Sequence, residues 1–424
     1  MDDRVACWST TLGLAVMLST ACQNSTIVLE TDSNESDEQP TSSSSTTSAG
    51  PSPTADPDDT GIGASTRQVD ILFVVDNSGS MGEEQGKMAA SIGRLTGILE
   101  DLTPPIDYRI GVTTTDNGNP YCGTTGPEAG ALRASSCRSR ASEFIFNGNE
   151  MIDATQEACL DHCSLEVLDL GGDRWVERSN STGTGNVAPE AFEETLRCML
   201  PQGIDGCGFE SHLESTWKTL RRSATEGDAA FGFLRPGALT AIVVVTDEVD
   251  CSYNSDWDTI FRPEGNRVFW SDPDAILPSS AVCWNAGVAC SGGGGGVYDE
   301  CFAIDLDENA NQVDPANADE DAVLRPLSRY TDLLDEFTTF MVLIGGVNTD
   351  GTITYADSLD DTQFQADFGI GPGCSSMASR AVPPVRLREV VEQVSGPGNL
   401  HSICDSDYTA AFESLAEGIF NRLP

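Results

Sequence analysis

Three oxygen-bearing side chains, Asp76, Ser78 and Ser80, alternate along the short segment DNSGS. The segment follows the apolar run VDILFVVD (69–76), and its glycine allows a tight turn. At this spacing the three side chains can direct their oxygen atoms toward one point. Oxygen-only ligand sets select hard cations, so the pattern predicts a site for Mg²⁺ or Ca²⁺, with Mn²⁺ as an alternative.

A second acidic segment, TDE (246–248), ends the apolar run ALTAIVVVTDE (238–248). Asp247 is placed to balance the charge of the cation from outside its direct ligands, through water or a serine hydroxyl. Because few of the direct ligands are charged, the cation would keep an affinity for a partner's carboxylate. The alternative is a capped turn between strand and helix, in which Asp76 and Ser78 accept backbone hydrogen bonds.

The elements that must position these residues follow an alternating pattern. Near-continuous apolar runs, typical of strands buried on both faces, lie at 69–76, 108–116, 238–248 and 340–347. Helical spacing of apolar residues lies between or after them, at 88–102, 213–220, 329–337, 385–395 and 408–420. This order predicts a doubly wound α/β domain with a mostly parallel sheet flanked by helices. Such sheets bind ligands at the carboxyl ends of their strands, where both acidic segments fall.

The segments ILFVVDNSGSM and VVVTDE resemble the first strand, the D-x-S-x-S signature and the second aspartate of von Willebrand factor type A domains. The resemblance covers roughly residues 68–420, interrupted by Cys-rich insertions near 117–202 and 250–328. It implies a Rossmann-like fold and a metal-ion-dependent adhesion site made by Asp76, Ser78, Ser80 and Asp247. It also implies a protein or matrix partner that presents a carboxylate to the cation.

The family usually takes a further ligand from a threonine in a loop that opens a helix. The segment GIDGCGFESHLE (203–214) is the best placed, but Ile204 stands where the threonine is expected. The residues that could substitute carry hydroxyl or carboxyl groups: Thr182, Thr184, Asp205 and Glu210.

The first 66 residues have the composition of a leader and a tether. An apolar run at 11–21 ends at Cys22 and resembles a bacterial lipoprotein signal, which implies a signal peptide at 1–21 and lipidation of Cys22. Gln23 in the next position implies sorting to the outer membrane. Cleavage without lipid and an uncleaved anchor remain alternatives. Residues 22–66, rich in Ser, Thr, Pro and Asp, are expected to tether a folded domain at 67–424 outside the cytoplasm, with the lipid as its only membrane attachment.

Cysteine usage also indicates export. Of 14 cysteines, Cys7 and Cys22 belong to the leader region, and the remaining twelve are scattered through the chain. An even number suits disulfides formed in an oxidising compartment, with a connectivity that sequence does not define. The segment CLDHC (159–163) could be half of a zinc site, but it lacks a second pair at metal spacing, which favours disulfides.

The charge balance excludes one class of partner. The chain has 67 acidic and 23 basic residues, a net charge of −44, so it repels phosphate backbones and we expect no nucleic-acid binding. In the acidic segment DLDENANQVD (305–314), carboxyl and amide side chains alternate as in the first half of a calcium-binding EF-hand loop. Ala310 and Ala316 replace the glycine and glutamate of that loop, which favours a solvated acidic loop.

The sequence does not predict an enzyme. The chain has three histidines, His162, His212 and His401, and we expect each to be structural, with His212 solvated on its helix. It contains neither a G-x-S-x-G elbow nor a phosphate-binding G-K-[ST] loop. We therefore expect a cell-surface lipoprotein that binds its partner through a cation. The alternatives are a structural envelope component with a stabilising metal, and a metal-dependent hydrolase.

Overall fold

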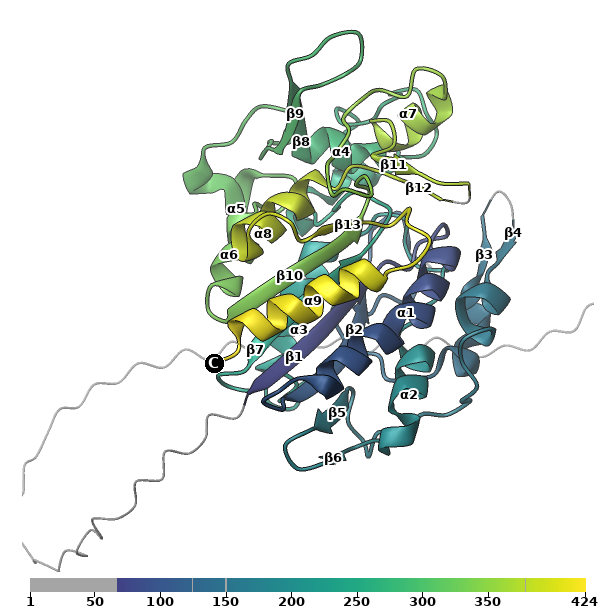
Figure 1. Cartoon of the computed structure of the whole chain (residues 1–424). Coiled ribbons are helices and arrows are strands. Elements are labelled where there is room, and N and C mark those ends of the chain that lie inside the picture. Colours follow the sequence, from purple (N-terminus) through teal and green to yellow (C-terminus); the bar gives the residue numbers. More distant parts are fainter. Residues whose placement is uncertain (1–66, 124, 149–150, 378) are drawn as a thin grey trace, which may run out of the picture. The chain divides into compact units, whose positions relative to one another are not determined.

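The computed structural model describes residues 67–424 except 124, 149–150 and 378 (Figure 1). The leader, Cys22 and the tether therefore lie outside the described residues. A seven-stranded sheet runs through the domain in the order β13-β10-β7-β1-β2-β5-β6. Its strands are β1 (Gln68–Val75), β2 (Asp107–Thr114), β5 (Val176–Ser179), β6 (Thr184–Gly185), β7 (Leu239–Val245), β10 (Thr338–Gly345) and β13 (Leu400–Ser402). The pairings from β13 to β2 are parallel, and β5 and β6 are antiparallel.

Helices cover both faces of the sheet. The helices packed on the sheet are α1 (Gly82–Asp101), α2 (Phe192–Met199), α3 (His212–Ser223), α6 (Ser328–Leu334), α8 (Val385–Ser395) and α9 (Thr409–Arg422). Helices α4 (Ala281–Gly287), α5 (Ala318–Asp321) and α7 (Thr362–Phe368) belong to separate apolar clusters. Side chains alternate across a strand, so Ile71 and Phe73 pack with α1, α2 and α9, while Leu72 and Val74 pack with α3, α6 and α8. Helices α1 and α9 lie side by side on the first face (Figure 1). The expected α/β fold class is confirmed.

The predicted elements all form, and their ends differ from the expected ones by a few residues. The pattern did not predict β5 and β6, which lie inside the segment interpreted as an insertion near 117–202 and extend the sheet beyond β2. The same segment supplies α2, whose Phe192 and Leu196 are buried against α1. Short strands of this kind, with mixed polar and charged residues, lack the continuous apolar run that marks a central strand.

The remaining elements between the sheet strands form small units of their own. Three two-stranded ribbons pair β3 (Ile145–Asn147) with β4 (Met151–Asp153), β8 (Val288–Ser291) with β9 (Glu300–Ala303), and β11 (Cys374–Ser375) with β12 (Arg380–Ala381). The segment near 250–328 buries a separate apolar cluster that includes Phe261, Phe269 and Trp284. None of the helices in the described part of the chain is both long and apolar enough to cross a membrane.

Disulfides tie these segments together. Within the described residues, all twelve predicted cysteines are paired: Cys122–Cys207, Cys137–Cys159, Cys163–Cys198, Cys251–Cys283, Cys290–Cys301 and Cys374–Cys404. The predicted disulfide chemistry is confirmed. Only one of these bonds joins cysteines that are near neighbours along the chain, so sequence proximity was a poor guide to the connectivity.

Candidate functional site

The two acidic segments meet at the carboxyl edge of the sheet. Strands β1 and β7 pair in parallel with Val75 opposite Val245, and the amide of Asp76 continues the pairing by donating to the Val245 carbonyl at 2.9 Å. Asp76 and Asp247 therefore follow the paired carboxyl ends of two adjacent strands. This placement follows from the apolar character of the two strands, which fixes both in the middle of the sheet.

The DNSGS loop forms a tight turn into α1. Asp76 is fully buried, and its Oδ1 accepts a hydrogen bond from the Ser78 amide at 2.8 Å. The hydroxyl groups of Ser78 and Ser80 lie 3.3 Å apart, with Ser78 buried and Ser80 exposed. The loop thus contains the turn hydrogen bond expected of a capped turn, and it also gathers the three predicted oxygen ligands.

Asp247 completes the predicted group of four residues. It is 4 % exposed, and its Oδ1 has no hydrogen-bond partner among the described residues. Burial, together with the negative charges of Asp76 and Glu248, raises the pKa of Asp247 well above its usual range, while a hydrogen bond with Ser80 opposes the rise. An unpaired carboxylate oxygen beside other carboxylates is a costly arrangement that a cation would relieve.

His212 is a site residue that the sequence reasoning misjudged. It was expected to be solvated, but it is fully buried at the start of α3, so that expectation is wrong. Its Nε2 lies 2.7 Å from the Thr246 hydroxyl, and this hydroxyl donates to Asp76 Oδ2 at 2.6 Å. Thr246 therefore links the imidazole to the carboxylate at the head of the DNSGS loop, and both oxygens of Asp76 are held.

A second buried carboxylate lies on the other side of the imidazole. Asp250 Oδ1 is 3.7 Å from His212 Nδ1, and Asp250 Oδ2 accepts from Arg386 Nε at 3.1 Å. Burial disfavours the charged imidazole, but Asp250 and Asp76 outweigh it and raise the pKa of His212 to about 9. Burial likewise opposes ionisation of Asp250, yet His212 and Arg386 lower its pKa to about 2. His212 is therefore a cation near neutral pH. The helical pattern around His212 did not predict its burial, because the residues that cover it, such as Asp250, come from the distant segment after β7.

The structure distinguishes among the candidates for the missing threonine. Ile204 is fully buried. Thr184 is opposite Ser179, which pairs with Asp107 at the amino end of β2, so Thr182 and Thr184 lie at the edge away from Asp76. Asp205 is exposed. The last candidate, Glu210, is buried and contacts Thr115, the residue that follows β2.

Glu210 is fully buried and accepts a hydrogen bond from the Thr115 hydroxyl through Oε2, while Oε1 is unpaired among the described residues. Burial, Asp76 and Glu248 raise the pKa of Glu210 well above its usual range. Glu248, with a hydrogen bond of 3.0 Å from the Ser280 hydroxyl, has its pKa raised to about 8 by burial and by Asp76. The site thus holds four carboxyl groups, of Asp76, Glu210, Asp247 and Glu248.

This donor set fits a hard cation. The ligands on offer are carboxylate and hydroxyl oxygens, and among the described residues Asp247 Oδ1 and Glu210 Oε1 of this group lack partners, as does Oε2 of the buried Glu84, whose charge acts on Asp247. In the described part of the chain, no three carboxyl groups bring oxygens within 4.8 Å of one another. A cation here would therefore contact few charged groups directly and reach the others through water, which leaves part of its charge for a ligand from outside.

A cavity of about 940 Å³ opens onto the same loops. Ser78, Ser80 and Glu248 line it on one side, and Phe146, Ile152 and Phe209 line it on another. One of the buried carboxyl groups, that of Glu248, and the two serines of the loop therefore border a space large enough for part of a macromolecular ligand.

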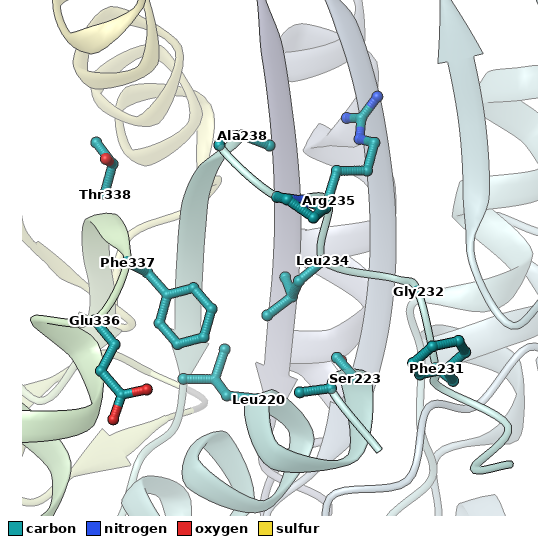
Figure 2. Close-up of a pocket in the computed structure, with 13 residues that line it drawn as sticks. Leu220, Ser223, Phe231, Gly232, Leu234, Arg235, Ala238, Glu336, Phe337 and Thr338 are labelled. Carbon is teal, nitrogen blue, oxygen red and sulfur yellow. The ribbon is translucent and has the colours of Figure 1, made fainter. Parts of the chain in front are cut away.

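Other candidate sites lack comparable chemistry. Figure 2 shows a cavity of about 470 Å³ near the amino ends of β7 and β10, where Leu220, Leu234 and Phe337 surround the space. The guanidinium of Arg235 points away from it and pairs with Asp70 at 2.6 Å. This cavity is apolar and distant from the acidic segments.

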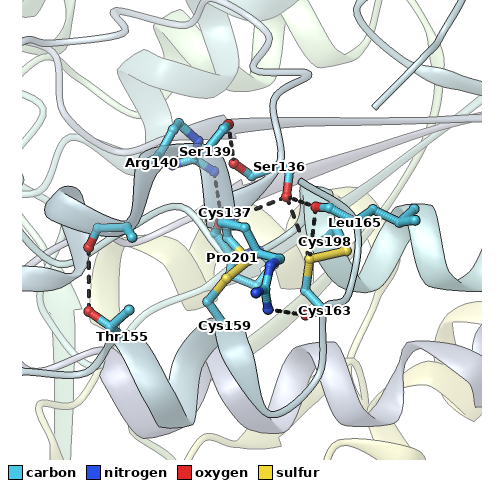
Figure 3. Close-up of a disulfide and its surroundings, with 12 residues drawn as sticks. Ser136, Cys137, Ser139, Arg140, Thr155, Cys159, Cys163, Leu165, Cys198 and Pro201 are labelled. Atoms are coloured by element: carbon cyan, nitrogen blue, oxygen red, sulfur yellow. Dashed lines mark hydrogen bonds between the residues drawn. A yellow bond between two sulfur atoms is a disulfide. The ribbon is translucent and has the colours of Figure 1, made fainter. Parts of the chain in front are cut away.

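The CLDHC segment is a disulfide site. Cys159 bonds to Cys137 and Cys163 to Cys198, and the two disulfides lie close together (Figure 3). No thiolate remains there to bind zinc. In the 305–314 loop, Asp307 Oδ1 accepts from the Asn309 and Asn311 amides, so the carboxylate closes its own turn.

The other two histidines lie apart from the site: His162 borders α1 near Gly86, and His401 is on β13, where burial lowers its pKa.

No protein-family model and no curated protein sequence matches the chain. Solved structures with some likeness include the pilus adhesin SpaC from Lactobacillus rhamnosus GG in its open conformation, with a TM-score of 0.36 and 10 % identity over 85 % of this chain and 31 % of that one. The chain thus spans about a third of the length of SpaC.

Two further likenesses are to pilus proteins. The vWF domain of the type V pili tip protein Mfa5 from Porphyromonas gingivalis gives a TM-score of 0.32 and 11 % identity over 85 % of this chain and 98 % of that domain. The pilus adhesin RrgA from Streptococcus pneumoniae gives a TM-score of 0.31 and 11 % identity over 84 % of this chain and 45 % of that one. At these identities and TM-scores the likeness assigns neither family nor function to this chain.

Proposed function

We propose that this chain binds a protein or matrix partner through a divalent cation held at the carboxyl edge of its sheet. The observation that carries the proposal is the group of buried carboxyl groups around Asp76 and Asp247, in which Asp247 Oδ1 and Glu210 Oε1 have no partner among the described residues, while Ser78, Ser80 and Glu248 of the same site line a cavity. Buried acids that face one another are unfavourable unless a positive charge joins them. Mg²⁺, Ca²⁺ or Mn²⁺ would supply that charge.

In this proposal Asp76, Ser78 and Ser80 hold the cation, and Asp247 supports it through Ser80 or water. Thr246 and His212 fix the Asp76 carboxylate, so its orientation is set before the cation binds. The bound cation supplies an incompletely neutralised positive charge, and a carboxylate of the partner completes its coordination. The role is binding, with no catalytic step.

We further propose that the domain is displayed at the cell surface by a lipid on Cys22, followed by the 22–66 tether and sorted to the outer membrane. Six disulfides in the described residues support folding in an oxidising compartment outside the cytoplasm. Mass spectrometry of the purified membrane form tests this directly. An acylated peptide that begins at Cys22 is expected, and a Cys22→Ser variant should be released from the membrane.

The cation site is tested by calorimetric titration of the purified protein with Mg²⁺, Ca²⁺ and Mn²⁺, and by thermal unfolding with and without EDTA. We expect cation binding and a higher Tm in the wild type, and neither in Asp76→Ala. Asp332→Ala is the matched control, because Asp332 is an exposed aspartate on α6. Equal cation binding by Asp76→Ala and wild type would refute the site.

The binding role is tested by retention of envelope components on immobilised protein. Retention should require the cation and should be lost in Asp76→Ala but not in Asp332→Ala. A cation that raises Tm while retention stays the same in EDTA would instead indicate the structural role.

A further inference from the structure

The cavity beside the proposed cation site has walls that come from outside the α/β core. Tyr121, Phe146 and Ile152 belong to the segment between β2 and α3, and Ser280 belongs to the segment between β7 and α6. Phe209 comes from the loop that leads to α3. The two long Cys-rich segments therefore converge on the DNSGS loop and give it an apolar border.

The apolar wall directly adjoins the cation loop. A Cβ atom added to Gly79 would lie 3.0 Å from the Phe146 ring, so this ring packs against the middle of the DNSGS segment. Tyr121 packs edge-on against Phe209 with ring centroids 5.7 Å apart. Tyr121 and Ile152 are each 42 % exposed, so apolar surface remains available within the cavity.

Disulfides hold two parts of these walls in place, those that carry Tyr121 with Phe209 and Ser280. Cys122–Cys207 joins the Tyr121 loop to the loop that carries Phe209. Cys251–Cys283 joins the exit of β7 to the segment that carries Ser280. A wall fixed before binding loses little conformational entropy when a ligand arrives.

The charges in the cavity limit what can bind there. Asp205, Glu248 and Asp367 line the same space as Ser78 and Ser80. One carboxylate can be accepted by the cation, but a second one nearby would face these acids. A polyanion such as an acidic polysaccharide, with carboxylates at regular intervals, is therefore disfavoured, and its hydroxyl groups would also meet the apolar wall without partners.

We propose that the ligand of this site is a polypeptide segment in which one Asp or Glu is adjacent to a large apolar side chain. The carboxylate binds the cation, and the apolar neighbour packs against Phe146, Ile152 and Tyr121. This inference rests on the proposed function, because it assigns the cation to the carboxylate, and it adds that the Cys-rich segments select the residue beside it. A cavity of about 940 Å³ has room for both groups.

The test uses an array of immobilised peptides with a fixed Asp, whose two neighbours are varied through all amino acids. Dense immobilisation makes weak single-site affinities measurable. The purified disulfide-intact protein is applied with Mn²⁺ or with EDTA, and oligogalacturonate on the same surface is the polysaccharide arm. We expect a Mn²⁺-dependent signal that is at least about tenfold stronger with Phe, Trp, Leu or Ile beside the Asp than with Ser.

Two variants test whether the apolar cavity lining causes the preference for an apolar residue beside the Asp. Ile152→Ser should lose most of the preference for an apolar neighbour, while Val167→Ser should keep it, since Val167 is 79 % exposed and lies outside the cavity lining. Both variants should bind Mn²⁺ as the wild type does.

The outcomes separate this inference from the proposed function. Absence of Mn²⁺ binding in the wild type overturns the proposed function. Intact Mn²⁺ binding with no neighbour preference, with no peptide signal, or with a stronger signal on oligogalacturonate overturns only the peptide assignment.

Discussion

Replacing Glu248 by glutamine should stabilise the cation-free protein, and the gain should grow with pH. Glu248 is 8 % exposed, and burial and Asp76 raise its pKa from 4.5 to about 8 even though Ser280 donates a hydrogen bond to it. A carboxyl group with a raised folded-state pKa binds a proton on folding between these two values. Its contribution to stability is therefore greatest below pH 4.5 and is lost as the pH rises toward 8.

The magnitude follows from the difference between the two pKa values. At about 1.4 kcal/mol per pH unit, the Glu248 carboxyl group lowers the unfolding free energy by about 1 kcal/mol at pH 5 and by about 3 kcal/mol at pH 7, relative to a neutral side chain. Glutamine keeps an oxygen that can accept the Ser280 hydrogen bond and has no proton to lose. The unfolding free energy of the variant should therefore exceed that of the wild type by an amount that widens over this interval.

The assay is urea unfolding in EDTA at pH 5, 6 and 7 with the disulfides intact. Glu226→Gln is the control, because Glu226 is exposed and should leave the pH dependence unchanged. Adding Mg²⁺ should shrink the difference between Glu248→Gln and wild type, since a bound cation favours the ionised carboxyl group. A constant difference across the three pH values in EDTA would refute the electrostatic account of the site.

Three other perturbations probe the framework of the site. His212→Ala should lower the unfolding free energy by about 3 kcal/mol, because it leaves the Asp76 and Asp250 carboxylates buried without the imidazole. Urea unfolding at pH 7 measures this loss. A loss below about 1 kcal/mol would contradict a buried, charged imidazole. Gly203→Ala should lower Tm, since Gly203 has a φ of 100° and a Cβ there would lie 2.8 Å from the Glu143 carbonyl oxygen; thermal unfolding at the wild-type Tm would show that this loop does not pack as described. The double variant Cys122→Ser, Cys207→Ser should be destabilised by about 4.5 kcal/mol in the chain-entropy model, given a separation of 85 residues. Unchanged unfolding would mean that the loop is held by other contacts.

The sheet was predictable from the sequence because its central strands are near-continuous apolar runs. Each residue of β1 from Val69 to Val75 is buried, so hydrophobic periodicity alone identified it. Parallel packing then placed Asp76 and Asp247 together, since residues that follow neighbouring parallel strands share an edge. The peripheral strands β5, β6 and β13 were not predicted, because they are short and none has such a run, although some of their residues, such as Val176, are buried.

The surroundings of the site were predictable only in part. Glu210 could be named as a candidate because it is an acid in the loop before a predicted helix, but its burial depends on contacts with Thr115 and Cys251 that are distant in sequence. The position of His212 was misjudged for the same reason. A helix pattern describes which face is apolar, and it does not show that residues 250–252 cover the first turn and bond to its amides.

The placement of the buried charges gives the site a direction. His212 and Arg386 both lie against Asp250, so this carboxylate is neutralised from two sides, and the imidazole reaches Asp76 only through Thr246 and at 3.9 Å. Asp247, Glu248 and Glu210 form no ion pair among the described residues: Asp247 is hydrogen-bonded to Ser80 and Glu248 lines the cavity, while Glu210 is buried against Thr115. The raised pKa values of Asp247 and Glu248 mean that these groups hold protons near neutral pH without a cation and can ionise when one enters, while His212 and Arg386 stabilise the carboxylates on the interior side.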